Sequence, residues 1–302
     1  MFGVNVTDYD RKVYEEELFD FLPDKIVDCH VHIYKEEMQR IKPENRKGCV
    51  NWPHMVAPDL TIEDMKESFS QMFPGKDVKA VIMGMPTCRL DAVNEYALSC
   101  AKQENIPALY CTNWDTTKDE IRAAMAAGFA GIKPYLNNCP SYIPEKEVRI
   151  FDYLTHEHME VMNELGGIVM LHIPRSLRLR DPVNLAQMLE IDEKYPNAKV
   201  YGTTLRQVIS ANEHLWGCLL LADGQWSVVE PRPIQVMDRI GGGDGFTGGL
   251  LYGLLQGWEG EKCLQFGWAS GVLAASSLND YAQPADEKQV WDIYAGNARV
   301  QR

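Results

Sequence analysis

The sequence predicts an α/β protein in two parts, and the change between them falls near Val200 and Tyr201. From residue 24 to about residue 200, short apolar runs alternate with amphipathic helical stretches, which is the pattern of successive βα units. Five such units in a row favour an incomplete (β/α)8 barrel over an antiparallel fold. After residue 201, two β-rich runs are followed by three helical stretches, which indicates a different domain or the end of one.

The predicted strands of the first part are mainly apolar, as expected for a parallel sheet that is buried on both faces. They are KIVDCHVHIY, VKAVIMGMP, IPALYCTNW, FAGIKPYL, GGIVMLHIP and the beginning of a sixth, NAKVYG. The predicted helices between them are EYALSCAKQ, KDEIRAAMAAG, the stretch around EHMEVMNELG, and VNLAQMLEIDEKYP.

The second part begins with strands and ends with helices. Its two β-rich runs lie in WGCLLLADGQWSVVEPRPIQVMD, where Asp223 and Gly224 form a hairpin-turn signal. The helices are predicted in DGFTGGLLYGLLQG, GEKCLQFGWASGVLAASSL and ADEKQVWDIYAG. No Gly/Ser-rich linker separates the two parts, so the boundary between domains 1–199 and 200–302 is expected inside a strand.

Composition narrows the class of protein. The 302 residues are 45% hydrophobic and 24% charged, as in a soluble globular protein, and no apolar run could span a bilayer. A small-molecule substrate is expected. A net charge of −13 argues against a nucleic-acid partner. The eight cysteines include no Cys-x-x-Cys pair and the acidic N-terminus is unlike a signal peptide, so a cytoplasmic location is expected.

Three histidines mark the ends of predicted strands. His30 and His32 are two residues apart on one strand, so both side chains point to the same face, and His172 ends a strand about four units later. In a parallel barrel the carboxyl ends of the strands are where sites form, and imidazoles there could bind a divalent ion. The alternative is a polar pocket that happens to contain two histidines.

The combination of IVDCHVH, GIKPY, VMLH and EKYPNAKV resembles the amidohydrolase superfamily over residues 10–200, in particular its metal-dependent hydrolases and decarboxylases. The resemblance implies zinc or manganese bound by His30, His32 and His172. It places Lys133 on the fourth strand, either as a metal bridge or as a buried lysine paired with a carboxylate. Arg175, shortly after His172, could bind a substrate carboxylate, and the favoured alternative is an ordinary surface arginine.

The family completes its metal site with an aspartate at the end of the eighth strand, and the chain departs from the family pattern before that strand. Asp238 and Asp280 are later carboxylates that could stand in for it. His54 lies in a loop, where it could contact a substrate, but a single loop histidine is expected to be incidental. His156 and His158 on a predicted helix are expected to be solvated.

A glycine turn followed by an aspartate opens the first helix of the second part. Gly241, Gly242 and Gly243 would let backbone N–H groups approach a phosphate at a helix N-terminus. Asp244 could then take the proton from an attacking alcohol. The alternative is a tight turn whose aspartate only caps the helix.

The segments TTLRQVISANEHLWGCLLLADGQW, MDRIGGGDGFTGGLLYGLLQG and YAQPADEKQVWDIYAGNARVQR resemble the C-terminal part of PfkB sugar kinases, which have a ribokinase-like α/β fold. The likeness covers residues 198–302 and is greatest to 2-dehydro-3-deoxygluconate kinases. It implies Asp244 as the catalytic base, the three glycines as an anion hole, and ATP with Mg²⁺ as cofactor. The sugar-binding N-terminal part of these kinases has no counterpart here.

Three hypotheses follow. The main one is a metal-dependent hydrolase or decarboxylase, impaired because its later strands are missing. The alternatives are an ATP-dependent sugar-acid kinase and a non-enzymatic mosaic, whose uncompleted sheet edges would favour self-association.

Overall fold

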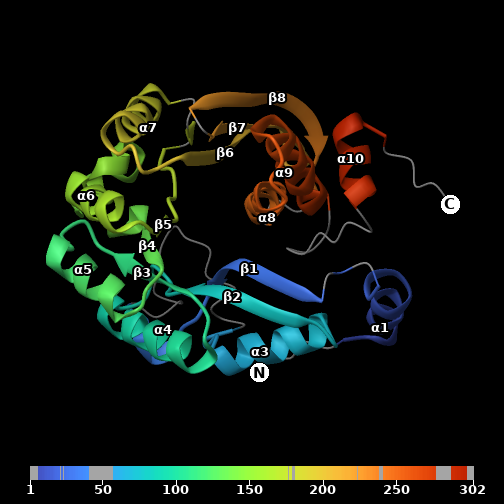
Figure 1. Ribbon diagram of the computed structural model, residues 1–302, viewed down its shortest axis with the longest axis horizontal. Coiled ribbons are helices and arrows are strands. Elements are labelled where there is room, and N and C mark those ends of the chain that lie inside the picture. Colours follow the sequence, from blue (N-terminus) through green and yellow to red (C-terminus); the bar gives the residue numbers. More distant parts are fainter. Residues whose placement is uncertain are drawn as a thin grey trace. The chain divides into compact units, whose positions relative to one another are not determined.

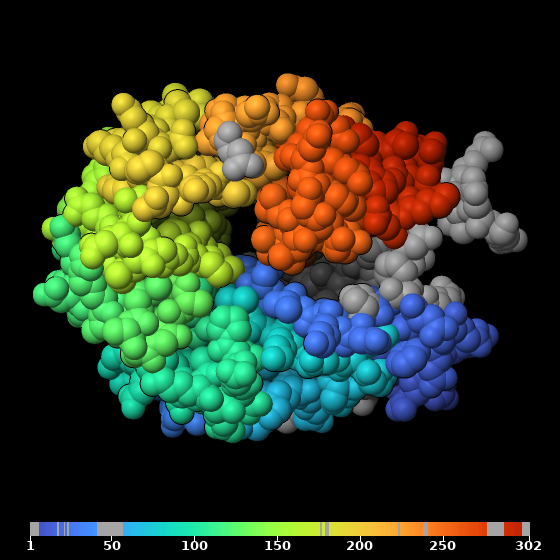
Figure 2. All heavy atoms as spheres, viewed as in Figure 1, coloured from blue at the N-terminus to red at the C-terminus, as the bar shows by residue number. Residues whose placement is uncertain are grey.

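The computed structural model describes residues 6–20, 22, 24–40, 57–175, 177–178, 181–222, 224–237, 241–276 and 287–297, coloured in Figure 2. The chain divides into two compact units, Met1–Arg175 and Ser176–Arg302, which are described separately. The division falls earlier in the chain than the sequence-based boundary at residue 199, so the helix that precedes the predicted join belongs to the second unit. None of the described helices is long and apolar enough to cross a membrane.

The first unit contains a parallel sheet whose five strands pair in chain order, each strand next to the one that follows it (Figure 1). The strands are β1 (Lys25–His32), β2 (Asp77–Met83), β3 (Ala108–Thr112), β4 (Gly131–Pro134) and β5 (Ile168–Val169). All five lie in predicted apolar runs, which confirms an α/β fold with a parallel sheet. A (β/α)8 barrel stays a prediction.

The helices of the first unit are α1 (Asp8–Val13), α3 (Ile62–Met72), α4 (Leu90–Glu104), α5 (Lys118–Ala127) and α6 (His156–Leu165). The helices α1, α3, α5 and α6 begin at threonine N-caps, whereas the N-cap residue of α4, Arg89, provides no side-chain cap. Thr61, Thr117 and Thr155 each form a capping box with the residue three positions later, which satisfies backbone N–H groups that the helix itself leaves without acceptors. A π-helical turn spans Tyr14–Leu18, and 3₁₀ turns span Glu36–Met38, Leu136–Asn138, Glu145–Glu147 and Ile150–Asp152.

Alternate residues of the strands pack into two apolar clusters. Ala80, Ile82 and Ala108 belong to a cluster that includes Phe69 of α3 and Ala97 of α4. The residues next to them in sequence belong to the second cluster, which consists of Val81, Met83, Leu109, Cys111 and Tyr135. Because side chains alternate between the two faces of a sheet, Val81, Met83, Leu109 and Cys111 lie on the same face as Tyr135.

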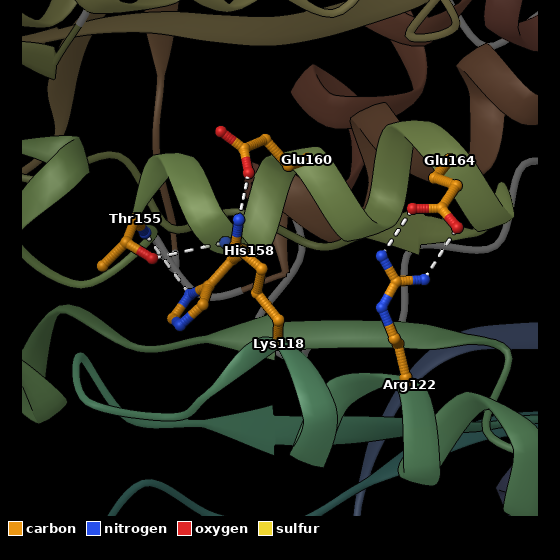
Figure 3. Close-up of polar contacts among 6 residues, drawn as sticks. All are labelled: Lys118, Arg122, Thr155, His158, Glu160 and Glu164. Carbon is orange, nitrogen blue, oxygen red and sulfur yellow. Dashed lines mark hydrogen bonds and ion pairs between the residues drawn. The ribbon is translucent and has the colours of Figure 1, made fainter.

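The α5–α6 pair corrects one expectation. His158 is fully buried, because it is the N3 residue of the Thr155 capping box and its Nε2 lies 2.8 Å from the carbonyl oxygen of Thr116. The solvated face of these helices carries ion pairs instead, Lys118 with Glu160 and Arg122 with Glu164 (Figure 3). The prediction that His158 is solvated was therefore wrong.

The second unit is built on an antiparallel sheet with strand order β6-β7-β8. Its elements are α7 (Pro182–Lys194), β6 (Val200–Val208), β7 (Glu213–Ala222), β8 (Gln225–Gln235), α8 (Gly242–Leu255), α9 (Gly260–Ala275) and α10 (Glu287–Ala295). The predicted turn joins β7 to β8, where Ala222 pairs with Gln225 and Gly224 has φ of 74°.

The run that begins with NAKVYG is a strand, as predicted, but it is not a sixth parallel strand of the first sheet. From Val200 to Val208 it pairs antiparallel with β7, because the chain turns back after Val208 and forms a hairpin. The predicted boundary at residue 199 consequently falls at the start of this hairpin.

The core of the second unit lies between one face of the sheet and the helices α8 and α9. Trp216, Cys218 and Leu220 of β7 belong to one buried cluster with Phe246 of α8 and Leu264 of α9. The two helices lie side by side (Figure 1), and glycines line their contact. Close helix packing through glycine therefore holds the first turn of α8 in place.

Candidate functional site

The first candidate site lies in the first unit, where β1 ends. The rings of His30 and His32 have centroids 5.0 Å apart and an interplanar angle of 61°. The two imidazoles therefore lie next to each other, and their convergence on one metal ion stays a prediction. The backbone N–H of His30 donates a hydrogen bond to the carboxylate of Asp28, which tightens the backbone just before the pair.

The carbonyl oxygen of Gly84, the residue directly after β2, is contacted by three side chains of this site and is called its hub. Nδ1 of His32 lies 3.0 Å from it and the hydroxyl of Tyr135 donates to it at 2.6 Å. The thiol of Cys111 lies 3.7 Å from the same oxygen. Gly84 must be glycine, because a Cβ there would lie 2.4 Å from a methyl carbon of Val93. The hub therefore joins the ends of four neighbouring strands.

Lys133 is buried, as predicted, with 3% of its surface exposed. Its ammonium lies 5.3 Å from the centre of the Tyr135 ring, which is within the range of a cation–π contact. Burial raises the pKa of Cys111 to about 12 and that of Tyr135 well above its ordinary value. The thiol and the phenol are therefore neutral near pH 7 and can act as hydrogen-bond donors.

The two imidazoles fit a metal ion in chemistry and in spacing. Two imidazoles that bind one tetrahedral zinc ion have ring centres roughly 5 Å apart, given Zn–N bonds of about 2.0–2.1 Å. The His30–His32 separation matches this spacing. Within the described ranges, however, no group of three or more His, Cys, Asp or Glu side chains that could hold a metal ion is found. Metal binding stays a prediction.

The other predicted residues of this site follow β5. His172 is exposed, and its backbone carbonyl accepts a hydrogen bond from the hydroxyl of Tyr153. Arg175 is half-buried with φ of 62°, and its guanidinium lies 3.5 Å from the carbonyl oxygen of Glu147. These contacts anchor the segment that carries the third histidine. His54, Asp238 and Asp280 lie outside the described residues.

The second candidate site is the first turn of α8 in the second unit. Gly241 is the N-cap with φ of 82°, a left-handed conformation that favours glycine. The N–H of Gly245 donates to the carbonyl of Gly241 at 2.8 Å and closes the first turn. The predicted glycine turn at the opening of a helix is thus present.

The glycines of this turn differ in their surroundings. A Cβ at Gly242 would lie 3.2 Å from the Trp216 ring, whereas a Cβ at Gly243 would meet no atom within 4 Å. The N-terminal end of α8 consequently has two exposed residues, Gly243 and Asp244, and a helix N-terminus suits the approach of an anionic ligand.

Comparison with known proteins finds a similarity in this part of the chain. Residues 216–287 match the pfkB family of carbohydrate kinases. The match includes most of β7 and all of β8, α8 and α9, and it contains the glycine turn. This segment of the C-terminal part is therefore similar to PfkB carbohydrate kinases, as its sequence motifs indicate.

Curated relatives match over a similarly short stretch. A 5-dehydro-2-deoxygluconokinase from Clostridium perfringens is 34% identical over 55 residues, or 18% of this chain and 16% of that protein. A 1-phosphofructokinase from Escherichia coli is 35% identical over 71 residues, or 24% of this chain and 22% of that protein. The chain thus spans about a fifth of the length of the curated relatives it matches.

Solved structures give a weaker likeness. The 2-dehydro-3-deoxygluconokinase of Thermotoga maritima aligns with 76% of this chain and 62% of its own, at 21% identity and a TM-score of 0.41. A PfkB family carbohydrate kinase from Listeria grayi aligns with 72% and 59%, at 22% identity and a TM-score of 0.39. Scores this low say nothing about the first unit, and the amidohydrolase resemblance gains no support from these proteins.

Sequence reasoning did not single out Gly84, Tyr135 or Trp216. A signal for Tyr135 was present, since it lies two residues after Lys133 and so on the same face of an extended chain. Gly84 follows an apolar run directly, but only the structure reveals that its carbonyl oxygen is the acceptor shared by neighbouring strands.

Proposed function

We propose that residues 200–302 carry the phosphate-binding and catalytic-base element of an ATP-dependent carbohydrate kinase. The observation that carries the proposal is the glycine turn at the start of α8, with Asp244 exposed beside it, inside the segment that matches the kinase family. This was the alternative hypothesis from the sequence, and it now has better support than the hydrolase hypothesis.

In the proposed reaction, Asp244 accepts the proton of a sugar hydroxyl while the hydroxyl oxygen attacks the γ-phosphorus of ATP. A bond forms between that oxygen and phosphorus, the bond to the β–γ bridging oxygen breaks, and ADP leaves. Backbone N–H groups of the Gly242–Asp244 turn, together with Mg²⁺, would stabilise the negative charge that is transferred. The substrate class we propose is a sugar acid of the deoxygluconate type.

The first experiment separates ligand binding from turnover. Gly243→Ala adds a methyl group that meets no protein atom, so it should leave folding intact but obstruct a phosphate at the turn. Gly248→Ala is the matched control, because it lies on the same helix and its Cβ also meets nothing within 4 Å. We expect MgATP to stabilise the wild type and the control against heat, and Gly243→Ala to lose most of that stabilisation.

Asp244→Asn should retain the MgATP-induced stabilisation but lose ADP formation in the presence of 2-dehydro-3-deoxygluconate. Equal stabilisation of wild type and Gly243→Ala by MgATP would place the nucleotide elsewhere. Absence of any MgATP effect on the wild type would refute the kinase proposal, and the non-enzymatic mosaic would then be the remaining interpretation of the second unit.

A second candidate function is metal-dependent hydrolysis or decarboxylation by the first unit. The specific observation in its favour is the pair His30 and His32, at the spacing expected for two imidazoles on one ion. A bound zinc or manganese ion would supply a water molecule of lowered pKa. About one transition metal ion per purified chain, lost in a His30→Ala/His172→Ala variant, would support this function, and a metal-free protein would refute it.

A further inference from the structure

The environment of His32 specifies which of its ring nitrogens holds the proton. Nδ1 lies 3.0 Å from the carbonyl oxygen of Gly84. A carbonyl oxygen only accepts hydrogen bonds, so this contact is favourable when Nδ1 bears the hydrogen and repulsive when it bears the lone pair. The Nδ1–H tautomer is therefore favoured, and Nε2 then bears the lone pair.

The contacts of Tyr135 disfavour the other tautomer of His32, in which Nε2 bears the hydrogen. Its hydroxyl lies 2.6 Å from the carbonyl oxygen of Gly84 and 3.3 Å from Nδ1 of His32. A hydroxyl has one proton, and the shorter contact commits that proton to Gly84. The phenolic oxygen then faces Nδ1 with a lone pair and becomes a second acceptor for the imidazole N–H.

We propose that Tyr135 is a positioning residue, which acts with the Gly84 carbonyl to hold His32 as the Nδ1–H tautomer with its Nε2 lone pair turned away from β2. The inference deepens the metal-site function proposed above and rests on it for its use. In metal sites, the hydrogen bond made by the second ring nitrogen sets the tautomer and the ring orientation of the ligand.

The surroundings of Tyr135 suit this role. It is 3% exposed, and its ring is packed in the apolar cluster that contains Met83, Leu109 and Cys111. Asn94 pins the adjacent strand end, because its side chain bonds both the N–H and the carbonyl of Cys111 at 2.9 Å. The hydroxyl of Tyr135 is thus held at a fixed place relative to Gly84.

The test uses the full chain and two matched variants. Tyr135→Phe removes the hydroxyl and keeps the ring. Tyr110→Phe makes the same chemical change on β3. The Tyr110 ring packs against Phe129 in the other apolar cluster of the sheet, away from Tyr135. Long-range ¹H–¹⁵N spectra of the metal-free protein report the tautomer of each histidine, and a His32→Gln variant assigns the signal of His32.

We expect the wild type and Tyr110→Phe to show His32 as the Nδ1–H tautomer, and Tyr135→Phe to show a mixture. In Co²⁺ titrations followed by visible absorption, Tyr135→Phe should bind about tenfold more weakly than Tyr110→Phe, the lower end of the range for a lost outer-shell partner. Far-UV circular dichroism checks that both variants fold.

A wild-type protein with His32 in the Nε2–H tautomer would overturn the inference. So would a Tyr135→Phe variant whose His32 spectrum equals that of the wild type. Failure of the wild type to bind Co²⁺ would instead refute the metal-site function, and the tautomer comparison in metal-free protein would still decide the role of Tyr135.

Discussion

Replacing Gly249 by alanine would place a methyl group where α9 leaves no room for it. The added Cβ would lie 2.7 Å from Cβ of Ser270, 3.0 Å from Cα of Gly267 and 3.1 Å from the carbonyl oxygen of Phe266. Two of these three atoms belong to the backbone, so no side-chain rotation relieves the overlap and the helices must move apart.

The magnitude follows from two opposing effects. Overpacking a close contact destabilises a protein by about 1–3 kcal/mol. Alanine is favoured over glycine in a helix by about 1 kcal/mol. Gly248→Ala on the same helix gains the second effect without the first, because Gly248 is exposed and its Cβ would meet nothing within 4 Å. The difference in unfolding free energy between the two variants should therefore be about 1–3 kcal/mol.

Urea unfolding followed by tryptophan fluorescence measures this difference, since five of the seven tryptophans lie in the second unit at positions 216, 226, 258, 268 and 291. We expect Gly248→Ala to unfold at higher urea than the wild type, and Gly249→Ala at clearly lower urea than Gly248→Ala. If Gly249→Ala is as stable as Gly248→Ala, α8 and α9 do not approach each other through this glycine face, and the packing argument fails.

Three further predictions concern the first unit. Burial lowers the pKa of His158, so the unfolded chain binds a proton at a higher pH than the folded chain does. The urea midpoint should therefore fall as the pH drops below about 6.5. His158→Gln, whose side chain suits the same capping position, should make the urea midpoint less dependent on pH. Asn94→Ala removes both partners of the buried Cys111 backbone and should destabilise the protein by about 2–4 kcal/mol in urea unfolding, with Asn94→Asp as a control that keeps the acceptor. Arg122→Ala breaks the exposed ion pair with Glu164 (Figure 3) and should leave the urea midpoint unchanged within error, so a clear loss would contradict its classification as a surface pair.

Much of the local structure could be predicted because each signal lies within one segment. The capping boxes begin with threonine, and the β7–β8 turn has a glycine at positive φ. Each of these features depends on only a few consecutive residues. The apolar runs likewise identified every strand of the parallel sheet. The direction of β6 could not be predicted in this way, because its partner is chosen by the hairpin that follows and not by its own composition.

The burial of His158 shows how a tertiary partner overrides a local pattern. Two histidines two residues apart on a helix point in different directions, and the sequence alone predicts that both side chains are solvated. The structure places His156 against the Phe151 ring and buries His158 next to the carbonyl of Thr116, which is 42 residues away in sequence. Nothing within α6 indicates that acceptor.

The two candidate sites differ for the same reason. The turn at Gly241–Asp244 uses backbone N–H groups and a carboxylate from one continuous segment, so the motif itself contains the site and the family match reinforces it. The histidine site draws on the ends of β1, β2, β3 and β4, and its hub is a carbonyl oxygen that any residue type possesses. A shift of one residue in the register of β1 would turn both imidazoles to the other face of the sheet. Sequence could therefore nominate His30 and His32, whereas the orientation of His32 by Gly84 and Tyr135 required the fold.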